Sequence, residues 1–278
     1  MMVSQQIDLA PPPSASASPR EAIVSFEGVE KAFNSANGSV TAVRDLNLSI
    51  FRGEILTVVG PSGCGKSTIL NMTAGLFAPT AGTVRYDGEK VQAPNRKTGY
   101  MTQKDHLLPW RTVAENIAVP LEIRGWDRKK RADRIAELTQ LVGLSGFEKS
   151  YPSQLSGGMR KRTALARLLA YDPETLLLDE PFAALDPQLR AKMQSELVRL
   201  CRTMKKTVIF VTHDLDEAVA LGDRCAVFTP RPGTIREIVD VPLPGDRNIL
   251  RLRNNEVFTK LAARLWDIIV PEEEGEIR

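Results

Sequence analysis

Residues 54–76, EILTVVGPSGCGKSTILNMTAGL, constrain the fold more than any other part of the chain. An unbroken apolar run ends at Gly60, two further glycines follow, and apolar residues at helical spacing begin after Ser67. A short apolar run of this kind is typical of a strand buried on both faces. The segment therefore predicts a buried strand, a glycine loop and a helix, in that order.

The loop in this segment, GPSGCGKS, matches the pattern G-x-x-x-x-G-K-[ST] between a strand and a helix. Backbone N–H groups in such a loop and at the helix N-terminus can surround phosphate groups. We expect Lys66 to reach the β and γ phosphate oxygens and Ser67 to ligate Mg²⁺. The predicted phosphate-binding residues are Gly60, Pro61, Ser62, Gly63, Cys64, Gly65, Lys66, Ser67 and Thr68. Cys64 could alternatively be a redox switch, although the loop requires its backbone rather than its thiol.

A second apolar run, TLLLDE, ends in the two acids Asp179 and Glu180. At the end of a buried strand, Asp179 can hold the Mg²⁺ shell. Glu180 can swing toward the γ-phosphate and polarise a water molecule. A generic P-loop kinase or switch GTPase does not need this second acid. Two acids after an apolar strand are common, so the pair gains its value from occurring together with the loop from Gly60 to Ser67.

Apolar runs and helical segments alternate along most of the chain, which predicts a parallel α/β sheet covered on both faces. The run TVIFVTHD follows a helical stretch expected at 188–204, and an amphipathic helix is expected at 257–269. Residues 99–174 are expected to be helical. Near the N-terminus, alternation in residues 22–33 and 41–54 predicts antiparallel strands.

Composition excludes several classes of protein. A formal net charge of +3 is too small to indicate a nucleic-acid partner, and no apolar run approaches the length of a membrane span. The basic run Arg128–Arg131 lacks interleaved aromatic residues, so it indicates a solvated helix face. Three separated cysteines, with no C-x-x-C pair, are expected to be free thiols in a reducing compartment.

The stretch LSGGMRKR, from Leu155, resembles the signature loop of ATP-binding cassette (ABC) proteins. Other elements of that family follow in order: Gln103 in YMTQ matches the Q-loop, Asp186 in AALD the D-loop, and His213 in VTHD the switch histidine. Phe33 stands where the family has an aromatic residue that stacks on adenine. Met159 and Thr102 depart from the commonest pattern without removing a phosphate-contacting atom.

The resemblance implies a P-loop NTPase (RecA-like) core with an antiparallel β subdomain and an inserted helical signature subdomain. The ABC ATPase domain is expected at 21–241, with the helical subdomain at about 104–172. A disordered tail at 1–20 and a C-terminal helical extension at 242–278 would flank it.

The resemblance also implies a composite site for ATP and Mg²⁺ in a head-to-tail dimer. Ser156, Gly157 and Gly158 of one subunit would close over the γ-phosphate that Lys66 of the other subunit holds. The implied catalytic residues are Glu180, His213 and Gln103. The implied metal ligands are Ser67, Gln103 and Asp179. Phe33 and Asp186 complete the implied nucleotide site.

One cassette without a membrane segment implies transmembrane permease subunits, a second ATPase subunit (a copy or a close paralogue) and a periplasmic or lipid-anchored substrate-binding protein. The stretches LLPWRTVAENIAVPLE, LSGGMRKR and FTPRPGTI resemble the nitrate, sulfonate, taurine and bicarbonate importer group. Thiamine-precursor or riboflavin importers, and a soluble cassette of translation or DNA repair, are the alternatives. The expected location is peripheral, on the cytoplasmic face of the inner membrane. Trp110 in LLPW either contacts the permease or packs in the core.

Overall fold

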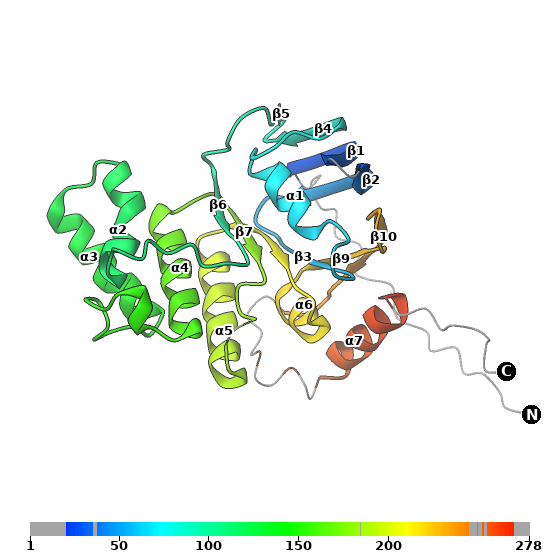
Figure 1. Ribbon diagram of the computed structural model, residues 1–278. Helices are drawn as coiled ribbons and strands as arrows, with labels where there is room; N and C mark the ends of the chain where they lie inside the picture. Colours follow the sequence, from blue (N-terminus) through cyan, green and yellow to red (C-terminus); the bar gives the residue numbers. More distant parts are fainter. Residues whose placement is uncertain are drawn as a thin grey trace, which may run out of the picture.

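The computed structural model describes residues 21–269 except 36–37, 184, 245–248, 250–251 and 253–254. The predicted tail at 1–20 and the last nine residues lie outside this range. Figure 1 shows two sheets near the centre and a group of helices at one end of the molecule. In the part of the chain that is described, no helix combines the length and the apolar character that a membrane span requires.

The larger sheet has six strands in the order β10-β9-β3-β8-β7-β6. All neighbouring pairs run parallel except the edge pair of β10 and β9. The strands are β3 (Ile55–Val59), β6 (Thr98–Met101), β7 (Thr175–Asp179), β8 (Thr207–Val211), β9 (Arg224–Phe228) and β10 (Ile235–Asp240). Every residue of β3, β7 and β8 is buried, so the prediction of strands covered on both faces is confirmed.

The smaller sheet is antiparallel and has the order β2-β1-β4-β5. Its strands are β1 (Ala22–Ser35), β2 (Gly38–Phe51), β4 (Ala81–Tyr86) and β5 (Glu89–Lys90). Alternate residues of β1 and β2, such as Val24, Phe26 and Leu48, face inward and are buried. This inward face packs on one side of the six-stranded sheet, with α1 (Lys66–Thr73) between them.

Three helices cover the opposite face of the six-stranded sheet: α5 (Pro187–Thr203), α6 (Leu215–Leu221) and α7 (Glu256–Ile269). The sheet thus has one hydrophobic core on each face. Alternate residues of β7 point into different cores: Leu176 and Leu178 pack with these helices, while Leu177 packs with α1. The α5 helix begins one residue before its predicted start. Asp186 caps it and Pro187 occupies its first turn, where proline is tolerated.

The helices α2 (Val113–Ile123), α3 (Arg128–Leu141) and α4 (Gly157–Tyr171) lie together at the end of the molecule farthest from the antiparallel sheet (Figure 1). A short 3₁₀ turn, Pro152–Gln154, precedes α4. The expectation that this helical part begins at residue 99 is wrong, because residues 98–101 form β6 and pair with β7. A four-residue strand is too short to show its period in the sequence.

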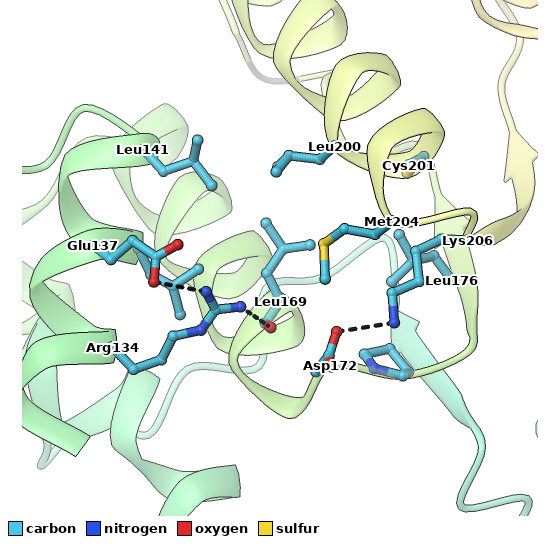
Figure 2. A pocket seen from close by; sticks show the side chains of 12 residues that line it. Arg134, Glu137, Leu141, Leu169, Asp172, Leu176, Leu200, Cys201, Met204 and Lys206 are labelled. Carbon is cyan, nitrogen blue, oxygen red and sulfur yellow. Dashed lines mark hydrogen bonds and ion pairs between the residues drawn. The ribbon is translucent and has the colours of Figure 1, made fainter. Parts of the chain in front are cut away.

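A cavity of about 60 Å³ lies where α3 and α4 meet the core helix α5 and strand β7. Figure 2 shows Leu141, Leu169, Leu200 and Met204 around it, with charged side chains at its rim. The Arg134 guanidinium donates to the carbonyl of Leu169, which joins α3 to the end of α4. The seam between the helical part and the core is therefore apolar inside and polar at its edge.

Candidate active site

The loop at residues 60–65 curls back over itself between β3 and α1. The Lys66 ammonium donates to the carbonyls of Gly60 and Pro61 at 2.7 and 2.9 Å. Gly65 has a φ of 104°, and a Cβ there would lie 2.6 Å from Cγ2 of Val43. Only glycine combines this conformation with such a close approach of β2. The structure thus places the glycine loop directly before the N-terminus of α1, a location where proteins can bind anions.

The turn between β9 and β10 supports this loop from outside. Gly233 exchanges backbone hydrogen bonds with β2, donating to the carbonyl of Ala42 and accepting from the amide of Arg44. The Arg231 guanidinium donates to the carbonyl of Gly63 at 3.0 Å. The loop is therefore held between the antiparallel sheet and a turn that lies about 170 residues later in sequence.

Asp179 ends β7 beside this loop and is only 6% exposed. Burial raises the pKa of its carboxyl, while a hydrogen bond from the Ser67 side chain opposes that rise. A carboxylate and a hydroxyl joined in this way are oxygen donors of the kind that Mg²⁺ prefers. Ser67 and Asp179 therefore fit the metal predicted from the sequence.

Glu180 turns out of the strand in a left-handed conformation, with a φ of 48°, and its amide donates to the carbonyl of Val211. The Gln103 side-chain amide donates to one carboxylate oxygen at 3.3 Å. Nδ1 of His213 lies 3.1 Å from the other oxygen. Three residues far apart in the sequence thus meet at one carboxylate, next to the Asp179–Ser67 pair.

The predicted signature residues lie on a different part of the fold. Ser156 caps α4, and its hydroxyl accepts from the amide of Met159 at 3.2 Å, with Gly157 and Gly158 forming the first turn. Figure 1 shows α4 beside α2 and α3, whereas α1 lies between the two sheets. The two glycine-containing loops of the sequence therefore belong to separate parts of the same chain.

Phe33 and Asp186 lie on different elements, near the end of β1 and at the start of α5. Phe33 is 42% exposed near the end of β1, pairs with Val40 of β2, and packs edge-on against Phe77. The strand β2 is the one that contacts the glycine loop at Gly65. Asp186 caps α5 by accepting from the amide of Leu189 at 2.9 Å.

Comparison with known proteins decides the family. The sequence pattern described as ABC transporter matches residues 43–183, which include the glycine loop, Gln103, the signature residues and both acids. The chain belongs to the ABC transporter family. It is an ATP-hydrolysing cassette with the P-loop NTPase fold predicted from the sequence.

Three relatives cover most of this cassette. An uncharacterised ABC transporter ATP-binding protein of Methanocaldococcus jannaschii is 49% identical over 88% of the chain and 91% of its own length. An aliphatic sulfonates import ATP-binding protein of Bacillus cereus is 41% identical over 87% of the chain and 94% of its own length. A nitrate import ATP-binding protein of Synechocystis is 40% identical over 82% of the chain and 86% of its own length.

A solved structure is similar to most of the cassette. It is a dimeric structure of a post-hydrolysis state of an ATP-binding cassette bound to ADP and phosphate. That chain is 32% identical, with a TM-score of 0.73, and the match covers 80% of this cassette and all of the other chain. The likeness therefore extends well beyond the glycine loop.

Sequence reasoning missed two buried polar residues of the ABC cassette that bond the backbone of the segment after β6. Asn116 is fully buried, and its side chain bonds both backbone groups of Leu108. Lys161 is 9% exposed and donates to the carbonyl of Gln103. A signal for Lys161 was available, because it shares the apolar face of α4 with Leu165 four residues later.

A groove of about 340 Å³ lies beside the Q-loop of the cassette, between β6, α2 and α4. Its lining includes Met101, Val119, Pro120 and Ile123, and Ile123 is 80% exposed. In the LLPW stretch, Leu107 is buried, whereas Trp110 is 71% exposed and does not pack in the core.

Proposed function

We propose that the chain is the energy-coupling ATPase of an importer for a small anion of the sulfonate, nitrate, taurine or bicarbonate kind. The meeting of Gln103 and His213 at the Glu180 carboxylate carries the proposal for hydrolysis. The sulfonate and nitrate import relatives, at 41% and 40% identity, support the importer class. A thiamine-precursor or riboflavin importer is the alternative substrate class.

Each site residue has a distinct task in this proposal. Lys66 and the amides of residues 60–68 bind the ATP phosphates, and Phe33 stacks on the adenine. Ser67, Asp179 and Gln103 would hold Mg²⁺, which would neutralise phosphate charge. Glu180 accepts a proton from the attacking water, while His213 orients that water and the γ-phosphate.

The signature residues act on the nucleotide of a second subunit in this proposal. Ser156, Gly157 and Gly158 lie where α4 begins, and amides in the first turn of a helix can bind an anion. Their position on the helical part, apart from α1, favours contact with the phosphates of a partner subunit. Asp186 would lie at the same subunit interface. The partner is a second copy or a close paralogue.

The groove beside the Q-loop would receive a short helix of a transmembrane permease. Exposed Ile123 supplies an apolar contact in this groove, and exposed Trp110 of the LLPW stretch would add another to the permease. The ATPase domain spans residues 21–241, with its helical subdomain at about 104–172 and an extension at 242–278. Together with a periplasmic or lipid-anchored binding protein, this complex would hold the cassette at the cytoplasmic face of the inner membrane.

Copurification from membranes tests this function. The tagged chain should recover a permease, and Ile123→Asp should weaken that association while leaving the ATPase activity of the isolated subunit unchanged. Val257→Asp, on an exposed position of α7, is the control and should keep the permease. Recovery of ribosomes or DNA instead of a permease would contradict the importer function.

A further inference from the structure

The segment that follows β6 is bound to α4 by three cations of that helix. The Arg160 guanidinium donates to the Asp105 carboxylate at 3.2 Å. Arg167 donates to the carbonyls of Asp105 and His106 at 3.0 and 2.9 Å. The Lys161 ammonium donates to the carbonyl of Gln103. Residues 103–106 are therefore attached to the helix that begins at the signature loop.

Lys161 differs from the two arginines because it is buried. It projects from the apolar face of α4 and is 9% exposed. Burial lowers the pKa of its ammonium, and the nearby carboxylates of Asp105, Asp179 and Glu180 oppose that effect. Burying an ammonium has a desolvation cost that a methionine at the same place would avoid. Stability alone therefore does not account for a lysine here.

The position of Lys161 suggests what it does. Its hydrogen bond holds the backbone of the residue whose side chain reaches the Glu180 carboxylate. A shift of about 1 Å in a group that orients reactants can lower a rate by as much as about 100-fold.

We propose that Lys161 is a positioning residue for hydrolysis, which fixes Gln103 against Glu180 and ties it to the signature helix of the same chain. This inference rests on the role proposed above for Gln103. Lys161 contacts no nucleotide in the proposal, so it should affect turnover much more than ATP binding.

Lys161→Met tests the proposal, because methionine keeps the apolar stem and removes the donor and the charge. We expect kcat of the purified full chain to fall about tenfold, with KM for ATP within about twofold of wild type. The melting temperature should be unchanged or higher. Lys161→Gln, which retains a shorter donor, should recover part of the rate. Lys129→Met on the exposed face of α3 is the control and should match wild type.

A double-mutant cycle with Gln103→Ala separates positioning from an independent role. The double variant should be no slower than Gln103→Ala alone. Multiplied losses, or a rate loss matched by a lower melting temperature, would overturn the inference. If Gln103→Ala is slow but Lys161→Met hydrolyses ATP at the wild-type rate, the inference about Lys161 is overturned and the proposed role of Gln103 stands. A wild-type rate for Gln103→Ala would overturn both this inference and the proposed role of Gln103.

Discussion

The Glu180 carboxylate accepts from Gln103 and lies against His213, so one side chain connects two elements that are 110 residues apart. Glu180→Gln should lower kcat by about 100-fold or more, because an amide cannot accept the proton of the attacking water. ATP affinity should stay within about threefold, since the carboxylate does not hold the nucleotide. Phosphate release and equilibrium binding of ATP measure the two effects.

Glu174→Gln is the matched control for that substitution, because Glu174 is exposed and immediately precedes the first residue of β7. It should hydrolyse ATP at the wild-type rate. Turnover retained in Glu180→Gln would mean that another group activates the water.

The three cysteines are free and buried, as the sequence led us to expect for their thiols. Burial raises the pKa of Cys201 and of Cys225 to about 12, and it also raises the pKa of Cys64. At pH 8 a thiol of pKa 12 is ionised in roughly one molecule in 10⁴, so alkylation should be slow. A thiol titration should find no rapidly reacting group in the folded chain and three after denaturation. Fast reaction at Cys64 with loss of ATP binding would instead support the redox switch.

Candidate catalytic and binding residues could be predicted from the sequence where a motif fixes the backbone around them. The glycine loop and the acids at the end of β7 are of this kind, because a strand must precede each of them. Lys161 and Asn116 were not predicted, since each acts through hydrogen bonds to backbone groups that the fold brings near. Trp110 remained ambiguous because apolar character alone does not separate an interface from a core.

The turn between β9 and β10 packs directly against the glycine loop, with no space for an additional atom at Gly233. A Cβ on Gly233 would lie 1.8 Å from the carbonyl oxygen of Cys64. Gly233→Ala must therefore displace the turn or the loop, at a cost of about 1–3 kcal/mol in unfolding free energy. ATP affinity should fall about tenfold because the loop amides move. Thermal unfolding and ATP titration measure both effects.

Arg236→Ala is the control for that prediction, because Arg236 is exposed on β10 of the same hairpin. It should leave both quantities unchanged. Normal ATP affinity in Gly233→Ala would mean that the turn yields and the loop does not depend on it.

Element types followed from sequence more readily than their arrangement. The apolar runs predicted β3, β7 and β8 because burial on both faces removes polar residues from the strand. The order β10-β9-β3-β8-β7-β6 depends on crossovers between distant segments, which no local pattern records. The four residues of β6 carry too few side chains to reveal a period.

For the whole molecule, mixing two defective subunits tests whether the signature loop acts on a partner. Lys66→Ala and Ser156→Arg should each abolish hydrolysis alone. In a mixed dimer, one composite site carries both defects and the other carries neither, so activity above the sum of the two variants should return. The measurement belongs in the assembled complex with its permease. No recovery, where wild-type subunits hydrolyse normally, would mean that both loops serve one chain.

The attachment of residues 103–106 to α4 has a consequence for how the two ATP molecules of such a dimer influence each other. In the proposed dimer, one unit would carry Gln103, which would face its own nucleotide, and Ser156, which would face the nucleotide of the neighbour. Binding at either site then restricts the same body, so the sites share a coupling free energy. ATP turnover should be cooperative, with a Hill coefficient between about 1 and 2, and Lys161→Met should bring that coefficient toward 1.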